Sequence, residues 1–184
     1  MHYLFAMDLA RARLTEERKN LVTARPIGTW GKPCKAADGS VDLFRWYFGV
    51  RPAPSSRYAL SDGETFRVEV RFSSSYPASP PSVKFDPPIY HTNVWPDGRV
   101  CLSLLLEEGH HGGKHKGYWQ ASRTFSEILR SLSIFLDEPN PDSIANADAC
   151  RDLKSSPSTY WKKVEECVRG YPARLARCLE TEKK

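Results

Sequence analysis

The chain has 184 residues, of which 40% are hydrophobic, and this is enough apolar material for the core of one domain. We expect a single domain over residues 1–184, with a core from about residue 9 to about residue 174 and short extensions at both ends. Five cysteines without a Cys-x-x-Cys pair argue against a disulfide framework or a zinc knuckle and favour a reducing compartment. The apolar start "MHYLFAM" is a poor signal peptide, and no stretch approaches the length of a membrane span.

The net charge of +5 is modest but uneven, because basic residues gather near the amino terminus. Asp8 is predicted to cap a helix over "LARARLTEERKNLVTA", which Pro26 ends. Ala10, Leu14 and Leu21 lie on one stripe of this helix, and most charges lie off it. The basic face could attract nucleic acid, a membrane or an acidic protein. Residues 9–25 contain no aromatic residue between the basic ones, which argues against nucleic acid.

Alternating hydrophobicity predicts strands over residues 41–50 and 65–72, and a shorter strand in "SVKFDPP" after a proline-rich loop. Arg67, Glu69 and Arg71 are expected on a solvent-facing side of an antiparallel sheet. "TFSEILRSLSIFL" predicts the central core helix, begun by a capping box of Thr124 and Glu127. Further helices are expected around "DACRDLK" and "STYWKKVEECVRG". The order indicates an α+β fold in which helices are segregated from an antiparallel meander.

Cys101 follows the turn sequence "WPDG", so its thiol is expected at or just beyond a turn. Free cysteine is often a small buried hydrophobe, and packing is one interpretation. A nucleophile is the other, and it needs an activating base or a role that does without one. His91 is the nearest histidine in sequence, and its place beside the apolar "PPIY" favours a structural role over that of a catalytic base.

Two stretches of the chain carry a family resemblance. "KFDPPIYHTNVWPDGRVCLSLL", followed by "EPNPDSIANADA", resembles the catalytic half of the ubiquitin-conjugating (UBC-like) enzymes, which have a His-Pro-Asn motif before a thioester-bearing cysteine. "RLTEERKNLVTARPIGTWGKPCKAADGSVDLFRW" resembles the amino-terminal helix and first strand of the SUMO-conjugating branch. The resemblance runs from about residue 10 to about residue 174 and thus covers nearly the whole chain.

The resemblance implies a UBC-like fold: an N-terminal helix, a four-stranded antiparallel meander, an active-site loop, a core helix and C-terminal helices. It also implies that Cys101 accepts SUMO from the SUMO-activating enzyme as a thioester and passes it to substrate lysines, without a cofactor. SUMO, bound covalently and at a possible noncovalent site, SUMO ligases and lysine-bearing proteins are the expected partners. We expect no nucleic acid or membrane partner, and a location in the nucleus and cytoplasm.

The resemblance assigns site residues one by one. Asn93 matches the motif asparagine, whose amide could donate to the oxyanion or steady the neighbouring loop. Ser143 stands where SUMO enzymes have an aspartate that assists the incoming lysine, and Asp142 could substitute for it. The expected contacts to the acceptor lysine and its neighbours are Trp95, Lys84, Asp97 and Cys150. Asp97, Arg99, Ser82 and Cys150 depart from the SUMO pattern, so the surface that reads the acceptor matches less well than the catalytic residues.

The resemblance also concerns the basic helix, the residue before Asn93 and the loop after Cys101. The basic residues expected to bind SUMO and the activating enzyme are Arg13, Arg18, Lys19 and Arg25. Thr92 replaces the motif proline, and we expect this to relax the backbone with little effect on chemistry. The loop from Leu105 to Trp119 is longer than in SUMO enzymes. Its "HHGGKH" could bind a metal through histidines, but no cysteine or carboxylate completes a ligand set at helical or knuckle spacing, so we expect no metal site. The alternatives are a ubiquitin-conjugating enzyme and a non-catalytic binding module of the same fold.

Overall fold

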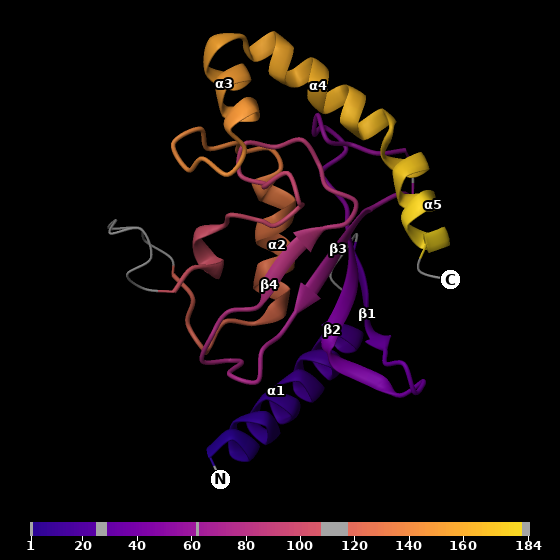
Figure 1. The fold of residues 1–184 in the computed structure, drawn as a ribbon, viewed down its shortest axis with the longest axis vertical. Coiled ribbons are helices and arrows are strands. Elements are labelled where there is room, and N and C mark those ends of the chain that lie inside the picture. The colour runs from indigo at the N-terminus through magenta and orange to yellow at the C-terminus, as the bar shows by residue number, and fades with distance from the viewer. Residues whose placement is uncertain (1, 25–28, 62, 108–117, 182–184) are drawn as a thin grey trace.

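The computed structural model describes residues 2–24, 29–61, 63–107 and 118–181. The elements in chain order are α1 (His2–Ala24), β1 (Thr29–Lys35), β2 (Val41–Val50), β3 (Phe66–Arg71), β4 (Ser82–Phe85), the 3-10 helix η1 (Ser103–Leu105), α2 (Phe125–Phe135), α3 (Ala147–Ser155), α4 (Pro157–Arg169) and α5 (Tyr171–Thr181). Figure 1 shows α1 and the α3–α5 run at opposite ends of the molecule, with α2 against the sheet between them. Among the described helices, none is both long and apolar enough to cross a bilayer.

The sheet is a four-stranded antiparallel meander in the order β1-β2-β3-β4. The pairing of β1 with β2 shifts register between Pro33 and Cys34, where proline removes a backbone donor from this edge strand. Trp46, Phe48 and Val50 alternate along β2 and are buried on its core side. The predicted α+β arrangement, with a meander and segregated helices, is confirmed.

Helix α2 fills the centre of the core, as its pattern predicts. Phe125, Ile128, Leu129 and Leu132 are almost fully buried. The ring of Phe125 lies 4.3 Å from that of Phe48, so the helix packs directly on β2. The predicted capping box is present: the Thr124 hydroxyl accepts from the Glu127 N–H, and the Glu127 carboxylate accepts from the Thr124 N–H.

Two expectations about the first half of the chain were wrong. Helix α1 begins at His2, so Asp8 lies inside it and does not cap it. Nothing in the preceding apolar residues breaks a helix, and an exposed aspartate is tolerated in a helix interior. The side chains on the outer side of β3 are also more buried than expected. Arg67 and Glu69 are 3% and 8% exposed, because Asp86 and the Tyr47 ring cover Arg67 while Arg45 and Arg71 cover Glu69.

The carboxyl-terminal helices follow the active-site half of the chain. Helices α3 and α4 match the two predicted segments, and α5 continues beyond them although no separate pattern predicted it. Tyr171, the first residue of α5, is buried, and its hydroxyl accepts from the Arg67 N–H at 2.7 Å. Helix α5 is therefore fixed to β3 by a contact between residues 104 positions apart.

Candidate functional site

A tight turn presents Cys101 at the molecular surface. Trp95 N–H donates to the Arg99 carbonyl at 2.9 Å, and Gly98 N–H donates to the Trp95 carbonyl at 2.8 Å. Gly98 has φ of 94°, and a Cβ there would lie 2.2 Å from the Phe85 carbonyl oxygen, so only glycine fits this turn. Beyond the turn, Cys101 N–H donates to the Asn93 carbonyl at 2.8 Å. Cys101 is thus held partly exposed by a hydrogen-bonded turn.

Cys101 lines a cleft of about 770 Å³. The loop of residues 91–102 carries Cys101 and is called the active-site loop below. The cleft lies between this loop, η1, the end of α2 and the segment that follows α2. Its polar lining includes Ser143, whose hydroxyl oxygen lies 3.4 Å from the Cys101 sulfur. Its apolar lining includes Ile134 and Ile144, which are among the exposed large hydrophobic residues. A thiol that lines an open cleft is accessible to a macromolecular partner. A cysteine that served only as a buried packing residue would not need this access.

Asn93 connects the active-site loop to the segment that follows α2. Its side-chain Nδ2 donates to the carbonyls of Asn140 at 2.8 Å and Ser143 at 2.6 Å. Its Oδ1 accepts from Asn140 N–H at 2.8 Å and from the Thr92 hydroxyl at 2.9 Å. The side chain is 2% exposed and both amide hydrogens are in use. Of the two roles expected for Asn93, the observed geometry corresponds to steadying the loop.

Thr92 does more than relax the backbone. Its buried hydroxyl donates to Asn93, and its carbonyl accepts from Ala145 N–H at 3.1 Å and Asn146 N–H at 3.0 Å. A proline at this position would have no hydroxyl to donate. This bond was not predicted, because the absence of a proline indicates only a backbone effect and does not reveal where the threonine hydroxyl points.

His91 is not placed to act as a base for Cys101. It is fully buried and stacks on Phe135 with ring centroids 4.4 Å apart. Its Nδ1 accepts from Asn93 N–H at 3.0 Å. Burial lowers the pKa of His91 to about 3, so the ring is neutral at physiological pH. The structural role expected from the sequence agrees with this geometry.

The two residues expected to assist the lysine lie differently. Ser143 faces the Cys101 sulfur, whereas Asp142 lines the same cleft and pairs with Lys154 of α3 at 3.2 Å. The Asp142 side chain is 86% exposed. Ser143 is therefore next to the thiol, and the carboxylate of Asp142 is at the cleft but already has a cationic partner.

The expected acceptor surface is only partly assembled. Trp95 lines the cleft with Cys101, and Arg99 stacks on its ring at 5.2 Å. Arg99 also pairs with Asp97 at 2.7 Å, and the backbone of Lys84 pairs with that of Arg99. The Arg99 N–H, the Arg99 guanidinium and Lys84 all lower the pKa of Asp97. Trp95, Lys84 and Asp97 are thus connected through Arg99, and of the three only Trp95 lines the cleft with the thiol.

Cys150 requires a correction, because it was expected at the acceptor surface. It is 4% exposed on α3, and its thiol points to the Thr92 carbonyl at 3.7 Å. Burial raises its pKa. Its position under the active-site loop leaves it no surface for a substrate.

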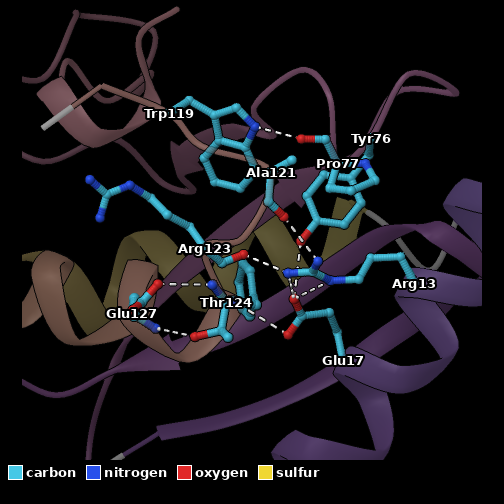
Figure 2. Close-up of polar contacts among 10 residues, drawn as sticks. Arg13, Glu17, Tyr76, Pro77, Trp119, Ala121, Arg123, Thr124 and Glu127 are labelled. Atoms are coloured by element: carbon cyan, nitrogen blue, oxygen red, sulfur yellow. Dashed lines mark hydrogen bonds and ion pairs between the residues drawn. The ribbon is translucent and has the colours of Figure 1, made fainter.

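Arg13 also differs from the expectation of a free docking residue. Its guanidinium pairs with buried Glu17 at 2.9 Å and donates to the carbonyls of Ala121 at 3.0 Å and Arg123 at 2.6 Å (Figure 2). Arg18 and Lys19 are exposed on α1, and Lys19 lies 3.6 Å from Glu16. Arg25 and most of the histidine-rich loop, residues 108–117, lie outside the described residues. In the part of the chain that is described, no cluster of metal-ligating side chains occurs.

Sequence reasoning missed the role of Glu17. Its carboxylate accepts from Arg13, from the Tyr76 hydroxyl at 3.2 Å and from Phe125 N–H at 3.2 Å (Figure 2). The last bond reaches the first turn of α2, where a negative charge is favoured. The one available signal was the position of Glu17 next to the apolar stripe of α1, three residues after Leu14.

The chain is similar to known proteins along most of its length. The family model described as ubiquitin-conjugating enzyme matches residues 13–168. The SUMO-conjugating enzyme UBC9 of Caenorhabditis elegans is 33% identical over 169 residues, which are 92% of this chain and 95% of that protein. Sumo-conjugating enzyme ubc9 of Dictyostelium discoideum is 33% identical over 89% of this chain and 96% of its own length. SUMO-conjugating enzyme SCE1 of Arabidopsis thaliana is 35% identical over 91% and 98%, respectively.

Proposed function

Because the chain belongs to the ubiquitin-conjugating enzyme family, we propose that it is a SUMO-conjugating enzyme that carries SUMO as a thioester on Cys101. The resemblance to the SUMO branch seen in the sequence is confirmed by these relatives. They favour SUMO over ubiquitin as the modifier. These relatives are conjugating enzymes, and this chain has Cys101 at an open cleft. Both facts favour an enzyme over a non-catalytic module.

The observation that carries the proposal is a partly exposed thiol beyond a hydrogen-bonded turn, with no histidine base beside it among the described residues. In loading, the Cys101 thiolate attacks the thioester carbonyl of SUMO on its activating enzyme. A new C–S bond forms, the old one breaks, and the activating enzyme's thiolate leaves. A carrier has no use for a strong general base, because such a base would also help water to hydrolyse the thioester.

In transfer, the acceptor lysine must lose a proton before its nitrogen can attack. An unperturbed lysine has a pKa of about 10.4, so it arrives as an ammonium. The neutral amine attacks the thioester carbonyl and a C–N bond forms, after which the nitrogen gives a second proton to water and the C–S bond breaks to return the Cys101 thiolate. Ser143 is placed to hydrogen-bond the amine, and the ammonium's proton passes to water or to Asp142. Asn93 keeps the Ser143 segment against the cysteine loop.

Two separate surfaces are proposed to contact the reactants and the partners. We assign the acceptor side to Trp95 and Lys84, because an indole shields an alkyl stem and an ammonium pairs with a carboxylate. The exposed cations Arg18 and Lys19 on α1 are the proposed contacts for the activating enzyme and for a noncovalent SUMO. SUMO ligases are further proposed partners.

One loading assay tests the function. The protein is incubated with ATP and either SUMO with its activating enzyme or ubiquitin with its own. A thiol-sensitive adduct on SUMO is expected, and Cys101→Ser should form a thiol-resistant ester instead. An adduct on ubiquitin but not SUMO contradicts the proposal. Thiol-sensitive loading of Cys101→Ser would place the carrier thiol at another cysteine.

A location in both nucleus and cytoplasm is also proposed. Its support is the odd number of dispersed cysteines, none of which forms a disulfide within the described structure, and this suits a reducing compartment. Imaging of a fluorescent fusion checks it, and restriction to a secretory compartment would contradict it.

A further inference from the structure

We propose that Lys154 competes with the acceptor lysine for the carboxylate of Asp142 and thereby restrains transfer from Cys101. This inference rests on the proposed function, because it concerns the transfer step of the thioester. It assigns Lys154 as a positioning residue that acts through Asp142. Lys154 lies on α3, is not among the residues that line the cleft, and pairs with Asp142 at 3.2 Å.

The charges around the cleft motivate the proposal. Two carboxylates, Glu138 and Asp142, line it together with Cys101, and within the described ranges 63–107 and 118–181 no lysine or arginine lines it. Such a cleft attracts an ammonium. The Lys154 ammonium already sits 3.2 Å from the Asp142 carboxylate and cancels part of that attraction. An acceptor lysine carries the same chemical group, so the two amines are exchangeable partners for one carboxylate.

The ion pair is easily exchanged. The side chains of Lys154 and Asp142 are 54% and 86% exposed, and pairs in such positions are weak. An incoming ammonium can therefore displace Lys154 without first breaking a buried contact. Asp142 would then hold the ammonium next to Ser143, which faces the Cys101 sulfur.

The pair is not what holds this segment in place. Asn93 binds the backbone of Asn140 and Ser143 through three hydrogen bonds of 2.6–2.8 Å. The Thr92 carbonyl accepts two more from Ala145 and Asn146. These contacts are buried or partly buried, whereas the Lys154 pair is in solvent. Removal of Lys154 should free a carboxylate without moving the segment.

The test uses the full chain loaded with SUMO, purified from ATP and activating enzyme, and discharged by free L-lysine at neutral pH. Loading is measured first, so that failure of the proposed function is seen separately. Lys154→Met keeps the alkyl stem and removes the charge. We expect it to raise discharge at low lysine about twofold to fivefold, the range of one exposed ion pair. The gain should lie in the lysine concentration for half-maximal rate, with the maximal rate little changed, and should shrink at high salt.

Three further variants make the result specific. Lys154→Arg keeps the cation and should behave as wild type. Lys162→Met removes an exposed lysine of α4 that does not line the cleft and should give no gain. With Asp142→Asn in place, Lys154→Met should lose its effect, because no carboxylate remains to be released.

The outcomes that overturn the inference are distinct. A lower rate in Lys154→Met, restored in Lys154→Arg, would make the pair a structural brace. An unchanged rate would show that the pair has no influence on transfer. An equal gain in the presence and absence of the Asp142 carboxylate would mean that Lys154 acts by general repulsion. Failure to load SUMO at all would instead count against the proposed function.

Discussion

Asn93 is the residue on which the active-site geometry depends most directly. Replacing it with alanine removes four side-chain hydrogen bonds and leaves backbone groups of Asn140 and Ser143 without their partners. We expect Asn93→Ala to lower the free energy of unfolding by about 2–3 kcal/mol. It should also slow discharge of the thioester, because Ser143 is no longer held beside the thiol. Urea denaturation and single-turnover discharge measure the two effects.

Thr92→Val is the matched control for this prediction. It keeps the shape of the side chain and removes only the hydroxyl that donates to Asn93. Its expected cost is about 1 kcal/mol, with a smaller effect on discharge. If Asn93→Ala abolished discharge while its stability stayed unchanged, the amide would act on the oxyanion and not on the loop.

Residue identities in the site were largely predictable, whereas their contacts were not. The turn before Cys101 was expected from "WPDG", and both a loop role for Asn93 and a structural role for His91 were among the expectations. The partners of Asn93 lie 47 and 50 residues further along the chain, so sequence spacing could not single them out. Cys150 was misplaced for the same reason, since burial on α3 depends on the Thr92 backbone above it.

At the scale of elements, buried Glu17 connects α1 to the start of α2. It is 3% exposed and accepts from Arg13, Tyr76 and Phe125 N–H (Figure 2). Glu17→Gln keeps the shape but removes the charge that pairs with Arg13. Breaking a buried ion pair from one side is costly, and because Arg13 is 24% exposed we expect a loss of about 2–4 kcal/mol.

Glu16 offers a control on the same helix. It is exposed and lies 3.6 Å from Lys19, so Glu16→Gln should cost less than about 0.5 kcal/mol. Urea denaturation of both variants at pH 7 gives the comparison. Equal costs would show that the Glu17 cluster does not join the two helices energetically.

Elements with a strong internal pattern were predicted well. Alternation located β2 and β3, and the Thr124 and Glu127 capping box located the start of α2. Elements without such a signal were predicted less well. Helix α1 starts six residues before Asp8. Helix α5 was not predicted as a separate helix, because its contacts are long-range: Tyr171 binds β3, and Arg174 donates to the Pro88 carbonyl. The buried Arg67 on the outer side of β3 could not be foreseen, because Asp86 and Tyr47 cover it only after folding.

At the scale of the whole molecule, buried polar contacts join the active-site loop to distant segments. The Tyr58 hydroxyl donates to the Tyr90 carbonyl at 2.7 Å and lies 3.1 Å from the Tyr160 hydroxyl. The Tyr90 hydroxyl in turn donates to Asp152 at 2.6 Å. These contacts attach the residues just before His91 to α3 and α4. Global stability and active-site geometry should therefore respond together when a buried group of this region changes its charge.

His91 is such a group, and it should make stability depend on pH. Its pKa is about 3 in the folded chain, because burial disfavours the charged ring, and about 6.5 in an unfolded chain. Between these values the unfolded state binds a proton that the folded state does not. The stabilisation is therefore complete above about pH 6.5 and is lost as the pH falls toward about 3, by about 1.4 kcal/mol per pH unit.

Lowering the pH from 7 to 5 should cost the wild-type chain about 2 kcal/mol through His91 alone. His91→Asn removes the titrating ring and retains an acceptor for the Asn93 N–H, so this variant should lack that share of the pH dependence. Urea denaturation at pH 7 and pH 5 gives the free energy of unfolding that each protein loses between the two pH values. The other histidines and the carboxylates contribute equally to both losses, so their contributions cancel when one loss is subtracted from the other. The absolute cost of the substitution does not enter the comparison. Equal losses in the two proteins would mean that His91 has a similar pKa in the folded and the unfolded chain. That result would contradict a neutral, buried His91 ring beneath the active-site loop.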